Sequence, residues 1–123
     1  MKDIETRANL EQLMTEFYKR LLQDSSISYI FTDVAKIDLE THLPHIVDFW
    51  EQSLFGNNGY RKNVMQIHLD LTAKEKFTQK HFETWLTHFE ATVNKLFSGE
   101  NAEKIKTRAV SIATVMQIKM HDQ

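Results

Sequence analysis

Apolar residues recur at three- and four-residue steps over most of this chain, and this periodicity restricts its fold more than any other feature. The strongest instance is residues 79–97, where one face carries Phe82, Trp85, Leu86, Phe89, Val93 and Leu96. Because an α-helix has about 3.6 residues per turn, this spacing brings side chains onto one side of a helix. The same pattern predicts helices over residues 4–23, 39–54 and 101–120, so we expect an all-α protein.

Helix-breaking residues are scarce, which agrees with a few long helices. The 123 residues include only three glycines and one proline, Pro44, which is expected to tighten or kink the helix over 39–54. Residues 27–31 could form a strand, but a lone strand would have nothing to pair with, so a short helix is predicted, with Phe31 pointing inward. A chain of this length forms one domain, residues 1–123.

Composition removes several classes of function. The formal net charge of -2 leaves no basic stripe for phosphates, so no nucleic-acid partner is expected. The start MKDIETR has no apolar core and no apolar run reaches membrane-spanning length, so we expect a cytoplasmic chain without a membrane partner. The absence of cysteine excludes disulfides, zinc ribbons, iron–sulfur clusters, thiolate-ligated haem and covalent haem attachment.

A single histidine, His68, lies between apolar neighbours in the stretch YRKNVMQIHLDL, residues 60–71. The stretch follows the run GNNG, residues 56–59, which predicts a loop because these residues tolerate positive φ. Imidazole is a common metal ligand and a switch near neutral pH. His68 alone is compatible with a metal ligand, a ligand to cofactor iron, a catalytic proton carrier or a histidine satisfied by backbone.

Four polar-tipped rings from separate segments are candidates for one site: Tyr18, His42, His68 and Trp85. Tyr18 lies at the edge of an apolar stripe and Trp85 within one, so each alone could equally be a boundary or core residue. Core packing gives no reason for all four to converge, whereas a flat apolar cofactor such as haem would. The remaining histidines beside the 79–97 face, His81 and His88, are expected to be solvated.

In this order and spacing, a set of short motifs resembles the third group of truncated haemoglobins. The motifs are FY at 17–18, IF ending at 31, HLPHIVDFW at 42–50, Tyr60, HLDL at 68–71, HFETWL at 81–86, and Phe89. The resemblance spans residues 10–116 and implies a globin-like, two-over-two helical sandwich. It also implies non-covalently bound haem b, iron protoporphyrin IX.

The resemblance further implies a role for each matching residue. His68 would be the proximal ligand of the iron, Tyr18 and Trp85 would donate hydrogen bonds to the bound gas, and His42 would stand at the entrance of the pocket. The slot would be lined by Phe31, Ile46, Phe49, Leu69 and Phe89, and the haem propionates would be met by Tyr60, Arg61 and Lys62.

The function implied is the binding of dioxygen or another diatomic gas, and a monomer is expected. Redox chemistry on that gas, such as nitric oxide conversion or a peroxidase-like reaction, would need a reductant that the sequence does not identify. Ligand binding alone is favoured over catalysis, and enzymatic activity stays open. One alternative is a zinc-binding helical enzyme or regulator using His42 and His45; another is a cofactor-free helical interaction module in which every ring is core.

Overall fold

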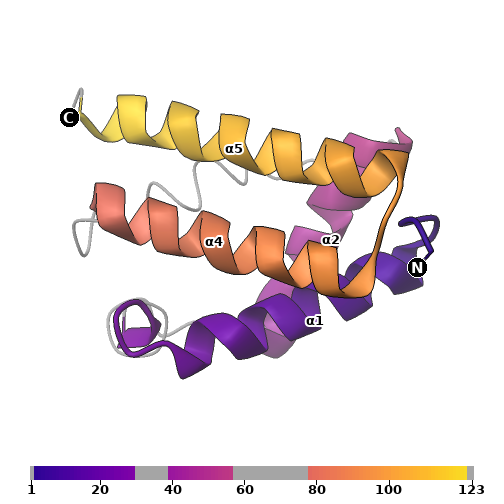
Figure 1. The fold of residues 1–123 in the computed structure, drawn as a ribbon, viewed down its shortest axis with the longest axis horizontal. Coiled ribbons are helices and arrows are strands. Elements are labelled where there is room, and N and C mark those ends of the chain that lie inside the picture. The colour runs from indigo at the N-terminus through magenta and orange to yellow at the C-terminus, as the bar shows by residue number, and fades with distance from the viewer. Residues whose placement is uncertain (1, 30–38, 57–77, 122–123) are drawn as a thin grey trace.

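The computed structural model describes residues 2–29, 39–56 and 78–121, without the side chains of residues 39–42, 116 and 119–121. These ranges contain four helices and no strand (Figure 1), so the all-α prediction is confirmed. The helices are α1 (Arg7–Gln23), α2 (Leu39–Phe55), α4 (Gln79–Leu96) and α5 (Glu100–His121). The expected helices over 39–54, 79–97 and 101–120 agree with α2, α4 and α5 to within one residue at each end.

The helices form two packed pairs. In Figure 1, α4 and α5 run antiparallel above α1, and α2 crosses behind them. α1 packs against α2 and α4, α4 packs against α5, and α2 reaches α5 as well. Between α1 and α2, the Arg7 guanidinium lies 2.6 Å from the Asp48 carboxylate and 3.0 Å from the Glu51 carboxylate. This is the two-over-two arrangement expected for the chain.

The start of α1 differs from the expected residue 4 because a capping box fixes it later. The Thr6 hydroxyl accepts from the Asn9 N–H at 3.2 Å, while the Asn9 side-chain oxygen accepts from the Thr6 N–H at 3.0 Å. Ile4 is fully buried although it precedes the helix. A side chain that caps its own backbone satisfies N–H groups that the helix leaves unpaired, and so sets its first residue.

The N-terminal segment also caps α5, from the far end of the chain. The Asp3 carboxylate accepts from the backbone N–H groups of Asn101 at 2.9 Å and Ala102 at 2.8 Å. Burial tends to raise the pKa of Asp3, but the backbone hydrogen bonds together hold that pKa below its ordinary value. Gly99 makes the approach possible, because its φ is +143° and an added Cβ would lie 2.5 Å from the Asp3 Cγ.

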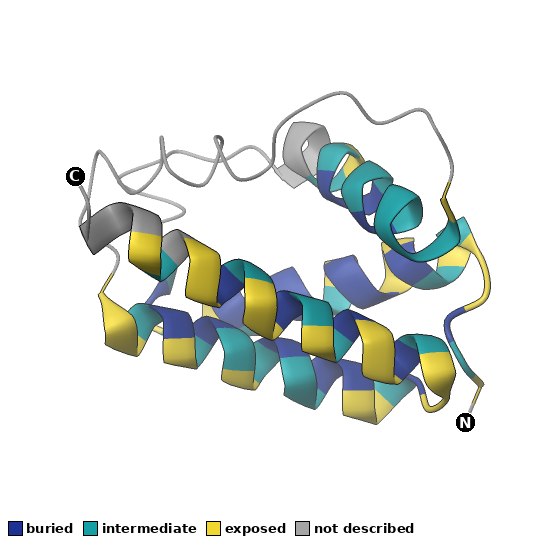
Figure 2. Ribbon diagram, turned by 90° about the horizontal axis from the view of Figure 1, so that it is seen from above, coloured by how far each residue is buried: buried dark blue, intermediate teal, exposed yellow. Residues whose placement is uncertain are grey.

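Aromatic rings fill the centre where α1, α2 and α4 meet. Phe17 of α1 meets Phe89 edge-on, with centroids 5.1 Å apart, and Trp85 edge-on at 5.6 Å. Phe89 stacks on Trp50 of α2 at 5.6 Å and on Trp85 at 5.5 Å. Figure 2 shows buried residues repeating along the inward sides of all four helices, as the apolar periodicity predicts.

Two local expectations are answered only in part. Residues 28–29 are helical, with the Ser28 N–H donating to the Asp24 carbonyl at 2.8 Å, and the rest of the helix predicted over 27–31 lies outside the described residues. Pro44 lies inside α2, which continues through it. None of the helices described combines the length and the apolar composition needed to cross a membrane.

Candidate functional site

A small cavity of about 20 Å³ lies where all four described helices meet. Its walls are Met14 and Tyr18 of α1, Ile46, Phe49 and Trp50 of α2, Trp85 of α4 and Ile112 of α5. Four of these side chains carry no polar group: Met14, Ile46, Phe49 and Ile112. The other three are the phenol Tyr18 and the indoles Trp50 and Trp85. The surface of the cavity is therefore almost entirely apolar, although three of the residues that line it, Tyr18, Trp50 and Trp85, have polar ring atoms.

Tyr18 is the phenol of this cavity, and it is buried far more than an edge position of its helix requires. Only 2% of its surface is exposed, and burial raises its pKa well above the ordinary value for a phenol. Its ring contacts Phe17 at a centroid distance of 5.3 Å. The phenol therefore keeps its proton near neutral pH and can donate a hydrogen bond.

Trp85 is held between two phenylalanines. Its indole stacks on Phe89 at an interplanar angle of 9°, and it meets Phe17 edge-on at 83°. The residue is 8% exposed. Because rings on two sides fix the indole plane, the N–H has a restricted direction, and an indole N–H acts only as a donor.

The α2 wall combines three residues at helical spacing. Phe49 and Trp50 follow Ile46 by three and four residues, so both lie on the same side of α2 as Ile46. The rings of Phe49 and Trp50 lie 5.0 Å apart at 70°. These three side chains are apolar except for the Trp50 N–H, and they border the same cavity as Tyr18 and Trp85.

Four of the residues predicted for the site thus line one cavity: Tyr18, Ile46, Phe49 and Trp85. Phe89 stacks on Trp85 and Trp50, two of the wall residues, rather than lining the cavity itself. The other predicted residues fall on parts that the structure does not describe. Phe31, Tyr60, Arg61, Lys62, His68 and Leu69 lie outside the described residues, and of His42 only the backbone is described.

Three wall residues were not predicted: Met14, Trp50 and Ile112. Each carried a signal in the sequence. Met14 precedes Tyr18 by four residues, Trp50 follows Ile46 by four, and Ile112 belongs to the apolar stripe of the last helix. The stripes placed them in the core, but only the packing of α1, α2 and α5 shows that they border the same space as Tyr18.

Two histidines expected to be solvated are in fact engaged. The His88 Nε2 lies 2.8 Å from the Asp24 carboxylate, which joins α4 to the end of α1. The hydrogen bond from His88, together with two from Ser26, lowers the pKa of Asp24 to about 2. His81 accepts from the Thr78 N–H at 3.0 Å through Nδ1 and so caps the start of α4. Neither histidine lines the cavity.

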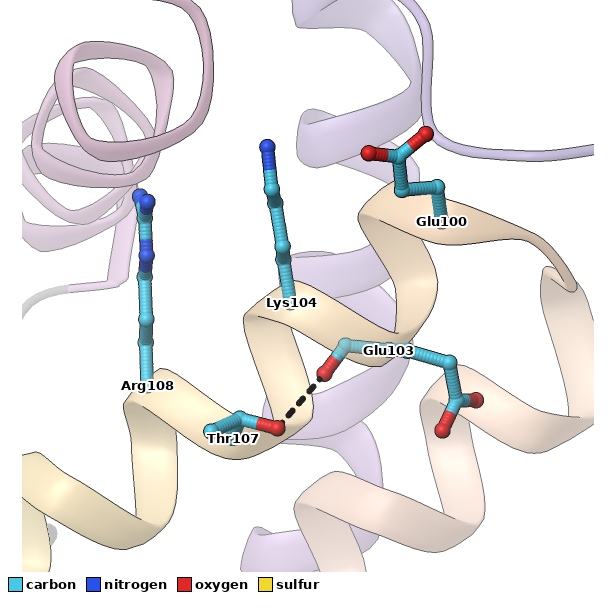
Figure 3. A pocket seen from close by; sticks show the side chains of 5 residues that line it. All are labelled: Glu100, Glu103, Lys104, Thr107 and Arg108. Atoms are coloured by element: carbon cyan, nitrogen blue, oxygen red, sulfur yellow. Dashed lines mark hydrogen bonds between the residues drawn. The ribbon is translucent and has the colours of Figure 1, made fainter.

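A second, open hollow of about 490 Å³ lies along α5, lined by Glu100, Glu103, Lys104, Thr107 and Arg108. In Figure 3 the side chains of Glu100, Lys104 and Arg108 extend from the same side of the helix. Arg108 donates to the Ser53 carbonyl and, at 2.7 Å, to the Ser53 hydroxyl. Ser53 lies near the end of α2, where helix carbonyls lack partners, so Arg108 ties α5 to α2 one turn before Ile112.

Among the residues and side chains described, no three histidine, cysteine, aspartate or glutamate side chains form a group that could hold a metal ion. His45 has its side chain described and His42 has not. The zinc alternative, which needs both, therefore stays a prediction.

Comparison with known proteins places this geometry in a family. The sequence profile of bacterial-like globins matches residues 2–121. A curated relative, the group 3 truncated hemoglobin ctb of Campylobacter jejuni, is 30% identical over 112 residues, which cover 89% of this chain and 86% of the relative. The crystal structure of a group III truncated hemoglobin from Campylobacter jejuni aligns with a TM-score of 0.84 at 28% identity, covering 98% of this chain and 95% of that one. This chain therefore belongs to the bacterial-like globins, as a haem-binding truncated haemoglobin of the third group.

Proposed function

We propose that this chain holds haem b non-covalently through His68 and binds dioxygen or another diatomic gas, with Tyr18 and Trp85 as hydrogen-bond donors to that gas. The observation that carries the proposal is that the phenol and the indole, from α1 and α4, border one apolar cavity. The iron of a bound haem would supply the centre at which a diatomic gas coordinates.

The chemistry of the cavity fits the gas-binding side of a haem pocket. A flat apolar cofactor needs apolar walls and a few well-placed polar groups, and the cavity offers Ile46 and Phe49 beside Tyr18 and Trp85. Among the side chains that the structure describes, none that borders the cavity is a carboxylate or a cation. Donors in an apolar setting act more strongly than in water, because no solvent competes for them.

Tyr18 is suited to act as the principal donor. Burial raises the pKa of its phenol, so the O–H is retained over the physiological pH range. A hydrogen-bond donor favours a gas that draws negative charge onto itself, since bonds to charged acceptors are the stronger ones. Dioxygen should gain more from this donor than carbon monoxide does.

Trp85 would add a second donor with a fixed direction. The stacked Phe89 and the edge-on Phe17 leave the indole little freedom to turn, so ordering it costs little when a gas binds. Two donors from different helices also mean that loss of either one would weaken, rather than abolish, retention of the gas.

The remaining assignments rest on the family resemblance. His42 would stand at the entrance, Phe31, Leu69 and the supporting Phe89 would contribute to the pocket, and the haem propionates would be met by Tyr60, Arg61 and Lys62. We propose that the protein acts as a single-domain monomer in the cytoplasm. Nitric oxide conversion or a peroxidase-like reaction, fed by a reductant of unknown identity, would extend gas binding to turnover.

The test is an absorption spectrum of the purified protein supplied with hemin, in ferric, ferrous and carbonyl-bound forms. We expect an intense haem spectrum in the original chain and loss of haem, or a changed spin state, in His68→Ala. His88→Ala is the matched control, since His88 pairs with Asp24 and does not border the cavity. A protein that stays colourless with hemin would contradict haem binding, and equal spectra of both variants would contradict the role of His68.

A further inference from the structure

We propose that His88 and Asp24 form a pH-sensitive latch, which attaches the corner after α1, residues 24–28, to α4. The latch is stronger when the His88 imidazole is protonated than when it is neutral. Neither side chain borders the cavity. The latch therefore goes beyond the proposed function and does not depend on haem or on a bound gas.

Asp24 organises the corner with both its side chain and its backbone. The carboxylate oxygen Oδ1 accepts from the Ser26 N–H at 2.9 Å and from the Ser26 hydroxyl at 2.7 Å. The Asp24 carbonyl accepts from the N–H groups of Ile27 at 3.1 Å and Ser28 at 2.8 Å. The Ile27 side chain is fully buried in the main core, so the corner must stay in place to keep this side chain away from water.

The second carboxylate oxygen connects the corner to α4. The Oδ2 atom of Asp24 lies 2.8 Å from the His88 Nε2 atom. The His88 side chain is 23% exposed and the Asp24 side chain 29%, so solvent and salt screen the pair only in part. Since Oδ1 serves the corner and Oδ2 serves α4, weakening the contact with His88 releases the corner from α4 and leaves its internal hydrogen bonds in place.

The carboxylate keeps its charge over the pH range in which an imidazole changes its own. Hydrogen bonds from His88 and Ser26 lower the pKa of Asp24 to about 2. An imidazole gains or loses its proton between about pH 5 and 8. A hydrogen bond between two charged groups is about twice as strong as a neutral one. The latch should therefore be strongest near the acid end of this range and weaken as the pH rises toward about 8.

The other charged groups near the pair do not titrate in this range. The residues three and four positions from His88 on α4 carry no charge. Arg20 lies one turn before Asp24 on α1, and an arginine stays charged at these pH values. Within the described ranges, Asp24 is the charged partner of His88, and no side chain of α5 forms a hydrogen bond or ion pair with it.

A second histidine of α4 lies next to the corner and should respond in the opposite direction. The His81 Nε2 atom lies 3.5 Å from the Tyr29 hydroxyl. The His81 Nδ1 atom accepts from the Thr78 N–H at 3.0 Å, and a protonated imidazole cannot accept there. Acid should therefore weaken the contacts of His81 while it strengthens the contact of His88, and the two effects can be separated by substitution.

The test is amide hydrogen exchange of the full-length chain at about pH 5.5 and about pH 8. The two reporters are the N–H groups of Ile27 and Ser28, which donate to the Asp24 carbonyl. Protection is the exchange rate of the unfolded chain divided by the measured rate, so the intrinsic effect of pH cancels. His88→Gln keeps a donor without a titrating charge, Asp24→Asn removes the carboxylate charge, and His81→Gln is the matched control.

In the original chain we expect about fivefold greater protection of both amides at the lower pH, from the difference between charged and neutral hydrogen bonds. His88→Gln and Asp24→Asn should give equal protection at the two pH values, while His81→Gln should keep the difference. Equal protection in the original chain would overturn the proposal. So would a difference that persists in His88→Gln, or one that disappears in His81→Gln alone. A chain that shows the expected pattern but stays colourless with hemin would refute the proposed function and leave the latch standing.

Discussion

Replacing Tyr18 by phenylalanine should speed dioxygen dissociation about 10- to 100-fold. The change deletes only the hydroxyl, so the ring keeps its place beside Phe17 at 5.3 Å. A hydrogen bond to an acceptor that carries charge contributes about 1.5–3 kcal/mol, and about 1.4 kcal/mol corresponds to one factor of ten. Since Trp85 borders the same cavity and keeps its N–H, the loss should stay near this range.

The assay is stopped-flow displacement of dioxygen by carbon monoxide. Carbon monoxide dissociation provides the internal control, because a gas that draws little negative charge should respond much less to loss of the donor. Trp85→Phe provides the companion variant, since it removes the indole N–H. An unchanged dioxygen rate in Tyr18→Phe, with a faster rate in Trp85→Phe, would refute the reasoning for Tyr18 and assign the donor role to the indole.

Three further predictions concern the contacts that hold the helices together. Gly99→Ala should lower the free energy of unfolding by about 1–3 kcal/mol in urea, because φ is +143° and the new Cβ would approach Asp3; a smaller loss would show that the turn relaxes. The pKa of Asp24 falls to about 2 beside His88, below an unfolded value of about 3.9, so its stabilisation is present above pH 4 and lost as the pH falls toward 2. Asp24→Asn should flatten stability over that interval, and an unchanged acid limb would contradict this. Arg108→Gln should lower the free energy of unfolding by about 2 kcal/mol, because it removes hydrogen bonds to the end of α2. Thermal melts measure this loss, and an unchanged melting temperature would show that the contact contributes little.

The sequence predicted the helices well because their apolar periodicity is a local property. It predicted the start of α1 less well, since Ile4 continues the apolar pattern while the Thr6 and Asn9 side chains fix the first residue. For Tyr18, the edge of an apolar stripe predicted a buried ring but left the hydroxyl open. The whole side chain becomes interior only when α2 and α4 close over it.

The residues of the candidate site also fall into two groups, those that the sequence identified and those that only the packing of the helices shows. Tyr18 and Trp85 were identifiable from the resemblance and from their polar tips, whereas Met14 and Ile112 look like any other core residues. Their role depends on which helix faces meet, and a periodic pattern carries no information about partners. The pairing of His88 with Asp24 was missed for the same reason, because 64 residues separate them.

The central rings explain why the walls of the cavity act together. Phe89 stacks on Trp50 of α2 and on Trp85 of α4, so one side chain that does not border the cavity connects two that do. A rigid stack resists independent movement of the two walls, because sliding either indole would open a void beside Phe89. The direction of the Trp85 N–H and the size of the apolar space are thus set by the same contacts. The proposed gas binding and the core packing of this chain therefore depend on one aromatic cluster, and a substitution at Phe89 should alter both.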